Sequence, residues 1–426
     1  MTPKFPLMTK SPQPAVLLKA KPHALSISID TMTSYSFDRK GRLIGAYVDG
    51  INYKRGLDNS LLRKWSTYGG PGPHRHRHKL DDGERREFFH EMTETLEEIH
   101  ANPDQYDSEA PEGWDAAWHW FEKCLYYDFE ALERDAGEFH RIYKPVSILP
   151  PDQYYSLVLQ ITEGCSYNKC TFCNFYQDRR FRIKSSGEVK EHIRDVNEFF
   201  GESMGLRQSI FLADANALIM PQKRLLTILE IIQDNYPIIA DPGKKKEIAQ
   251  RRRAGDVVFD GIYSFIDLFT GEHKAEAEFQ AMAELGVKRA YIGMESGSKA
   301  LLEFLEKPGS KEEMMDAVNK IKAGGVDVGV IVLLGAGGKD YSDLHIEHTV
   351  DAINGMQLDS EDFIYFSDFY PQENTRYEAV AAEAGIEAMS WDDRRTQEQR
   401  IRARLRFQDP KTGPKITAYD IREFLY

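Results

Sequence analysis

The chain has 426 residues, of which 41% are hydrophobic and 12% aromatic, enough for two or three domains with a substantial core. Its 55 Lys and Arg against 68 Asp and Glu give a net charge of −13, which disfavours a broad nucleic-acid footprint. No apolar run approaches the ~20 residues of a membrane-spanning helix, and the N-terminus lacks the apolar region of an export signal. Together with the free cysteines, these features predict a cytoplasmic protein.

Basic residues are concentrated at the start of the chain, and acidic residues follow them. Residues 1–80 contain 14 Lys and Arg against 4 Asp, whereas residues 81–150 contain 6 Lys and Arg against 19 Asp and Glu. We expect residues 1–33 to form a basic arm that packs on the acidic helices after it. The alternative is an arm that addresses a phosphate-bearing or acidic substrate.

An α+β region is predicted for residues 34–148. Residues 34–57 alternate apolar and polar side chains around turn signals, which predicts a small β-meander. Residues 84–100 and 112–134 carry apolar and aromatic residues at helical spacing, which indicates two helices that pack into a core. Cys124 lies in the second of them, where a buried free thiol is expected.

From residue 149 onward, strands and helices alternate. Strands are predicted at residues 155–161, 209–212, 261–269, 289–294, 326–334 and 363–369, and helices at residues 186–200, 221–235, 274–285, 298–306, 311–323 and 341–355. Six β/α units with apolar strands predict a parallel sheet covered by helices. In such α/β folds the chemistry belongs at the carboxyl ends of the strands.

Three of the four cysteines, Cys165, Cys170 and Cys173, fall within nine residues directly after the first of these strands. Three close thiolates leave one coordination position to another ligand, as in a [4Fe–4S] cluster with one open iron. A zinc site, which usually has four closed ligands, and chance clustering are the alternatives. A disulfide is disfavoured because nothing in the chain indicates secretion.

This triplet, with the aromatic Phe172 just before its third cysteine, resembles the signature of the radical S-adenosylmethionine superfamily over roughly residues 150–370. The resemblance implies an α/β fold, a partial (β/α)6 TIM-like barrel over residues 149–370. The N-terminal α+β region is expected as an addition outside the resemblance, and a C-terminal extension, 371–426, is expected to close the barrel. It implies that Cys165, Cys170 and Cys173 hold a [4Fe–4S] cluster whose open iron binds S-adenosylmethionine. Reductive cleavage then yields a 5′-deoxyadenosyl radical that abstracts hydrogen from a substrate.

The resemblance also assigns a binding site for S-adenosylmethionine. The expected residues are Phe172 in the cysteine loop, Asp214 and Asn216 after the second strand, Glu295 and Ser296 after the fourth, and Gly335 and Gly337 after the fifth. Residues 290–307 resemble the subgroup of tRNA methylthiotransferases and oxygen-independent coproporphyrinogen dehydrogenases. The chain departs from the family in one respect, because four residues separate Cys165 from Cys170 where three are usual.

The substrate side of the sequence is less informative. Candidate catalytic residues are His273 and Lys274 after the third strand and Tyr176 after the cysteine loop, although an ordinary turn explains the first two equally well. We expect the N-terminal aromatic helices and residues 370–377 to close the barrel over a small or medium-sized metabolite. An electron donor such as flavodoxin or ferredoxin is the expected partner.

Two other functions stay open. The first is the same radical chemistry on RNA or a peptide, docked on the basic arm or on the basic runs at residues 244–246 and 251–253. Those runs are more simply interpreted as solvated surface loops, so a small molecule is favoured over a macromolecule. The second is a non-catalytic protein in which the cysteine triplet binds zinc.

Overall fold

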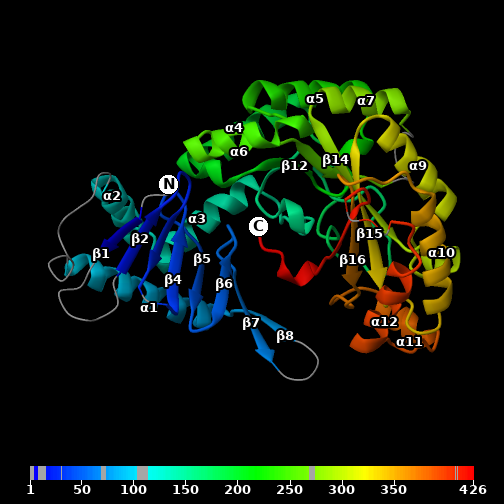
Figure 1. Cartoon of the computed structure of the whole chain (residues 1–426), viewed down its shortest axis with the longest axis horizontal. Helices are drawn as coiled ribbons and strands as arrows, with labels where there is room; N and C mark the ends of the chain where they lie inside the picture. The colour runs from blue at the N-terminus through cyan, green and yellow to red at the C-terminus, as the bar shows by residue number, and fades with distance from the viewer. Residues whose placement is uncertain are drawn as a thin grey trace.

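The structure, a computed structural model, describes residues 4–7, 16–29, 31–68, 73–102, 114–267, 274–407, 409 and 411–426. An N-terminal sheet with its helices lies beside a larger α/β barrel, and the C-terminal segment runs between the two (Figure 1). Across these residues, no helix is both long enough and apolar enough to span a membrane.

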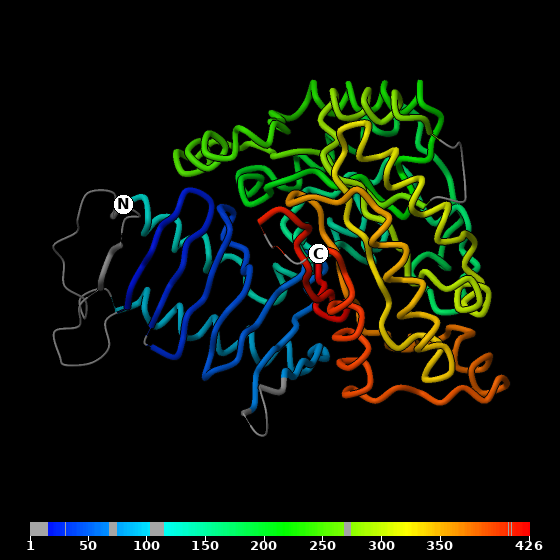
Figure 2. Tube along the Cα trace, turned by 45° about the vertical axis from the view of Figure 1, so that its right-hand side comes forward, coloured from blue at the N-terminus to red at the C-terminus, as the bar shows by residue number. Residues whose placement is uncertain are grey.

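The N-terminal region is an antiparallel sheet of eight strands that pair in chain order. The strands are β1 (Lys4–Leu7), β2 (Val16–Ala20), β3 (Leu25–Ser28), β4 (Thr33–Phe37), β5 (Leu43–Val48), β6 (Ile51–Arg55), β7 (Leu61–Tyr68) and β8 (Pro73–Lys79). One face is apolar and packs on helices α1 (Asp82–Ala101), α2 (Trp114–Leu125) and α3 (Phe129–Ile142), which lie behind the sheet in Figure 2. This alternation of buried and half-buried residues is typical of a sheet covered on one side.

This sheet is larger than the predicted meander. Residues before position 34, expected to be a separate arm, supply β2 and β3 of the same sheet, so a boundary at residue 33 does not divide the structure. Helix α1 does pair with a basic residue of the sheet, since Arg63 Nη2 on β7 lies 3.5 Å from Glu84 Oε1, but Arg63 lies outside the arm predicted over residues 1–33. The single helix predicted over 112–134 is two helices, because the Asp128 side chain accepts a hydrogen bond from Ala131 N and caps α3. Cys124 is buried in α2, as predicted.

The barrel is a parallel sheet of seven strands in the spatial order β17-β16-β15-β14-β13-β12-β9. Its strands are β9 (Ser156–Gln160), β12 (Ser209–Ala213), β13 (Ile262–Phe265), β14 (Val287–Glu295), β15 (Asp327–Leu334), β16 (Phe363–Asp368) and β17 (Lys415–Ala418). A two-stranded ribbon, β10 (Thr162–Glu163) and β11 (Arg182–Ile183), flanks the cysteine loop. The helices are α4 (Ser186–Phe200), α5 (Gln222–Asn235), α6 (Lys245–Ala254), α7 (Glu276–Glu284), α8 (Lys299–Phe304), α9 (Lys311–Ala323), α10 (Ser342–Gly355), α11 (Tyr377–Glu383) and α12 (Trp391–Arg402).

All six predicted β/α units are present, and the structure holds further elements that were not predicted, among them β17 and α6. Strand β17 comes from the C-terminal extension and pairs with β16 in parallel. The basic runs at 244–246 and 251–253 are not loops, because they stand at the two ends of helix α6. Only Ile248 of that helix is buried, so the apolar periodicity that would have indicated it is missing.

The parallel sheet does not close on itself, and β9 and β17 are its two edges. Two segments fill the opening between them. They are the extended linker of residues 143–150 and the tail of residues 419–426, which contains a short 3-10 helix at Ile421–Glu423. On the β9 edge, Tyr143 Oη donates to Val158 O at 2.9 Å, and Val158 N donates to Tyr426 Oη at 2.8 Å. Tyr419 Oη donates to Leu149 O at 2.8 Å and ties the tail to the linker. At Val158, two tyrosine hydroxyl groups thus form the hydrogen bonds that a neighbouring strand would otherwise make with this edge of β9.

The N-terminal sheet covers this tail from the outside. Lys54 Nζ donates to Leu425 O at 2.9 Å, and Lys64 Nζ lies 3.3 Å from Glu423 Oε2. Arg77 of β8 forms ion pairs with Asp420 and Glu423. The barrel is therefore closed by the linker, the tail and the sheet, and not by the aromatic helices α1 and α2, which pack on the other face of that sheet.

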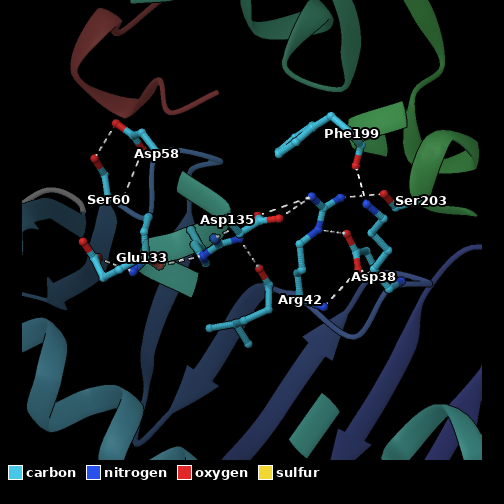
Figure 3. A network of polar contacts seen from close by, with 12 residues as sticks. Asp38, Arg42, Asp58, Ser60, Glu133, Asp135, Phe199 and Ser203 are labelled. Atoms are coloured by element: carbon cyan, nitrogen blue, oxygen red, sulfur yellow. Dashed lines mark hydrogen bonds and ion pairs between the residues drawn. The ribbon is translucent and has the colours of Figure 1, made fainter. Parts of the chain in front are cut away.

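A buried ionic network joins the N-terminal region to the barrel (Figure 3). Arg42 donates from Nε to Asp38 Oδ2 at 2.7 Å and from Nη2 to Ser203 Oγ, just beyond α4, at 2.6 Å. Its Nη1 lies 3.2 Å from Asp135 Oδ1 on α3. Burial alone lowers the pKa of Arg42, but the charges of Asp38 and Asp135 outweigh it and raise the pKa overall. One guanidinium thus connects three elements of two regions.

Candidate active site

A cavity of about 1160 Å³, including its open mouth, lies at the carboxyl ends of the barrel strands. Its walls are mainly apolar and aromatic, with a small number of polar side chains. Cys165, Cys170 and Cys173 all line it, whereas Cys124 belongs to the separate core of the N-terminal region. The structure therefore brings the predicted triplet together at the predicted end of the barrel.

The loop that carries the cysteines is held by hydrogen bonds to its surroundings. At its start Gly164, with φ +77°, donates from N to Asp214 Oδ2 at 2.8 Å. Between the first two cysteines Asn168 adopts φ +51°, a conformation that Asn tolerates better than most residues, and its N lies 3.4 Å from Cys165 Sγ. Thr171 N donates to Leu305 O at 3.0 Å. The longer spacing of this motif is therefore accommodated by a left-handed turn at Asn168.

The three thiols are difficult to ionise without a nearby positive charge. Burial raises the pKa of Cys165, and it raises the pKa values of Cys170 and Cys173 to about 11 and about 12. Like-charge repulsion from Cys165 also raises the pKa of Cys170, and repulsion from Cys165 and Cys170 raises the pKa of Cys173, whereas Lys307 lowers the pKa of all three. A bound metal centre supplies the missing positive charge. Three half-buried thiols around one open cavity fit a cluster with one open iron better than a closed zinc site.

A polar group beside the first cysteine joins three strand ends. Asn216, after β12, donates from Nδ2 to Ser166 Oγ at 2.7 Å and also to Asp267 Oδ2. Ser166 Oγ donates to the same Asp267 oxygen at 3.0 Å. Asn216 Nδ2 lies 3.9 Å from Cys165 Sγ. The predicted Asn216 thus lines the cavity, next to an unpredicted carboxylate.

Glu295 and Lys307 form a largely buried ion pair in the same cavity. Lys307 Nζ lies 3.2 Å from Glu295 Oε1, and both side chains line the cavity. Glu295 has φ +59° at the end of β14, which turns the chain there. Glu295 was predicted at this place, and Lys307 was not.

Two predicted aromatic residues reach the cavity. Phe172 lines it and packs against a cluster that includes Leu333 and Phe369. Tyr176 also lines it, and burial raises the pKa of Tyr176 well above its usual value. At neutral pH its hydroxyl is therefore protonated and can donate a hydrogen bond, but it does not act as a base.

Several other predicted residues face away from the cavity. Asp214 is buried beneath the loop, where it accepts hydrogen bonds from Gly164 N and Gln160 Nε2. Ser296 is fully buried, and its Oγ lies 2.8 Å from His345 Nδ1. Neither Asp214 nor Ser296 lines the cavity, so neither is proposed to contact a cofactor there. Their positions indicate that they hold the strand ends in place.

The glycine turn after β15 and the turn before α7 are also structural. Gly335 N donates to Gln397 Oε1 on α12, and Gly337 N donates to Tyr377 Oη on α11, both at 2.9 Å. Lys274 Nζ donates to Met220 O at 2.9 Å and does not line the cavity. Gly335, Gly337 and Lys274 were predicted as site residues, but they do not line the cavity and make packing contacts instead. His273 lies outside the described residues.

The burial of His345 beside Ser296 predicts a loss of stability in acid. Burial lowers the pKa of His345 to about 4, so between pH 6.5 and 4 the unfolded chain binds a proton that the folded chain does not. Stability is therefore present above pH 6.5 and lost toward pH 4, by about 3 kcal/mol from this group. Chemical denaturation of wild type and of His345→Asn across this range tests it, because the variant is expected to lose less stability. Parallel pH profiles for the two proteins would contradict it.

Residues 159–353 match the model of the radical SAM superfamily. No curated protein matches the chain significantly. Similar solved structures include coproporphyrinogen III oxidase (HemN) from Escherichia coli, which is 11% identical over 65% of this chain and 55% of its own, with a TM-score of 0.40. Methylornithine synthase (PylB) is 16% identical over 68% of this chain and 78% of its own, with a TM-score of 0.37.

A third similar structure is the radical S-adenosylmethionine methyltransferase TsrM from Kitasatospora setae, bound to cobalamin and a [4Fe–4S] cluster. It is 15% identical over 57% of this chain, with a TM-score of 0.38, and the chain spans 41% of its length. In another TsrM structure the chain spans 36% of the length. The cysteine triplet lies within the residues 159–353 that match the superfamily model.

Proposed function

Because residues 159–353 place this chain in the radical SAM superfamily, we propose that Cys165, Cys170 and Cys173 hold a [4Fe–4S] cluster at which S-adenosylmethionine is cleaved reductively. One observation carries this assignment. The three thiols line a single cavity, and among the described residues no other thiol and no imidazole lines it. Three ligands leave one iron free for the cosubstrate.

When bound, the cluster and S-adenosylmethionine supply a 5′-deoxyadenosyl radical that abstracts a hydrogen atom from the substrate. The side chains of the cavity orient the cosubstrate. Asn216 and Glu295 offer an amide and a carboxylate near the cysteines, which suits the amino and hydroxyl groups of the cosubstrate. Phe172 offers an apolar surface for the adenine. The linker and the tail fill the lateral opening and exclude water from the reacting centre.

The substrate of this proposal is a small or medium-sized metabolite. The remaining wall of the cavity is aromatic and apolar, and it is formed by Phe265, Tyr291, Phe369, Tyr370 and Tyr419. Ser367, Asp368 and Gln372 are polar groups on the side of β16. Because the lateral opening is filled, a substrate enters at the carboxyl ends of the strands, which favours a compact molecule over an RNA or a peptide. A reduced flavodoxin or ferredoxin is the proposed electron donor.

Anaerobic reconstitution tests the reaction. We expect ~4 iron and ~4 sulfide per chain, and 5′-deoxyadenosine after reduction in the presence of S-adenosylmethionine. Zinc without iron, or no 5′-deoxyadenosine from the reduced protein, would contradict the assignment of this chain as a radical SAM enzyme. Low-molecular-weight metabolites, RNA and peptides are then added separately. Stimulation of 5′-deoxyadenosine formation by the metabolite fraction alone supports the small substrate, and stimulation by either polymer alone overturns it.

A further inference from the structure

Lys307 carries a largely buried ammonium group that has no role in the cleavage proposed above. Its side chain is 10% exposed, and it lines the same cavity as the three cysteines. Among the described residues that line this cavity, it is the sole Lys, Arg or His, whereas Asp267, Glu295 and Asp368 are acidic. The cavity thus places one cation beside three thiols and three carboxyl groups.

The local fold is arranged to hold this cation. Lys307 follows helix α8, where its N donates to Leu302 O at 2.8 Å and the preceding Glu306 adopts φ +50°. Gly293 on β14 leaves the space that the Glu295–Lys307 pair occupies. A Cβ atom on Gly293 would lie 3.4 Å from Lys307 Nζ and would collide with the Glu295 carboxylate.

Lys307 is charged in this position. Burial lowers its pKa, but Glu295 and Cys170 favour the ammonium more strongly, and the pKa is raised overall. A fixed charge in a water-poor cavity acts on its neighbours far more strongly than the same charge in water. In the proposed reaction the cluster gains negative charge, and Lys307 lines the same cavity as the three cysteines proposed to hold it.

We propose that Lys307 sets the reduction potential of the [4Fe–4S] cluster held by Cys165, Cys170 and Cys173, by stabilising its reduced form. The proposal rests on the proposed function. Reduction adds one electron to the cluster, drawn from the external electron donor, and leaves the ammonium and the ligand set unchanged. Net charge around a cluster is one of the factors that set its potential, and a nearby cation favours the more negative state. Lys307 is thus a positioning residue for electron entry, acting through the cluster.

Redox titration of the reconstituted cluster without S-adenosylmethionine tests this role, with the reduced cluster followed by electron paramagnetic resonance. We expect Lys307→Met to lower the equilibrium constant for one-electron reduction about tenfold, which is 59 mV for a one-electron couple. Lys307→Arg keeps the charge and is expected to stay near wild type. Lys184→Met is the matched control, because Lys184 is also 10% exposed and lies 3.8 Å from Glu163, but it does not line the cavity. Its potential is expected to stay unchanged.

A second variant guards against a fold defect in Lys307→Met. Glu295→Gln removes a negative charge from the same wall, so it is expected to shift the potential upward, opposite to Lys307→Met. Equal potentials in wild type, Lys307→Met and Glu295→Gln overturn the role of Lys307, while the cluster itself remains. Loss of S-adenosylmethionine binding with an unshifted potential overturns it as well. A wild-type protein that assembles no cluster refutes the proposed function together with this one.

Discussion

Replacing Cys165, Cys170 or Cys173 with Ala is expected to reduce 5′-deoxyadenosine formation to background. Each cysteine is one of the three proposed ligands at the same cavity, and the described residues that line it offer no other thiol or imidazole as a substitute. Two thiolates do not hold a cluster that needs three. Iron and sulfide content after anaerobic reconstitution measures the first effect, and product chromatography measures the second.

Cys124→Ala is the matched control for this series. Cys124 is buried in α2 with its Sγ 3.4 Å from Trp120 O, in the core of the N-terminal region. We expect this variant to keep the full iron content and to form 5′-deoxyadenosine at the wild-type level. Loss of the cluster in Cys124→Ala, or its retention in any variant of the triplet, would contradict the assignment of the ligands.

Arg42→Ala is expected to lower the free energy of unfolding by about 3–5 kcal/mol. The change leaves Asp38 and Asp135 without the guanidinium that both contact, and removing one partner of a buried ion pair has a cost of this size. It also removes the hydrogen bond to Ser203 and with it a polar link between the N-terminal sheet and the barrel. Denaturant unfolding followed by circular dichroism measures the loss.

Arg86→Ala removes the same charge from the protein surface and serves as the control. Arg86 and its partner Glu130 are each 61% exposed, and exposed pairs of this kind contribute at most about 1 kcal/mol. We expect a small change for Arg86→Ala and a large one for Arg42→Ala. Similar losses in the two variants would show that the buried network does not hold the two regions together.

The order of strands and the place of the cysteine loop could be predicted from the sequence, because both depend on local pattern. Apolar runs separated by helical periodicity mark the β/α units, and the triplet stands directly after the first of them. Strand β17 escaped notice because its four residues, Lys415–Ala418, are too short and too polar to stand out. Helix α6 was not predicted because charged residues dominate its sequence and only Ile248 is buried.

Side-chain direction at the strand ends could not be predicted in the same way. Asp214 and Asn216 both follow β12, but hydrogen bonds from Gly164 and Gln160 draw Asp214 inward and leave Asn216 at the cavity. Asp267 was missed because the strand predicted over 261–269 would have placed it inside the strand, whereas β13 ends at Phe265. Lys307 reaches the cavity only through tertiary packing of the turn after α8, and no periodicity marks such a residue.

The tail between β9 and β17 has a consequence for the order in which the chain folds. Its Tyr426 pairs with Val158 across 268 positions of sequence, whereas the strands of the N-terminal sheet pair with their direct neighbours. Contacts between distant residues form late, since the entropy of closing a long loop must be overcome first. During synthesis the side of the barrel therefore stays open until residues 419–426 have been made. In this interval the lateral opening beside the cysteine loop is not yet filled, so the proposed cluster can be assembled from that side before residues 419–426 pack into place.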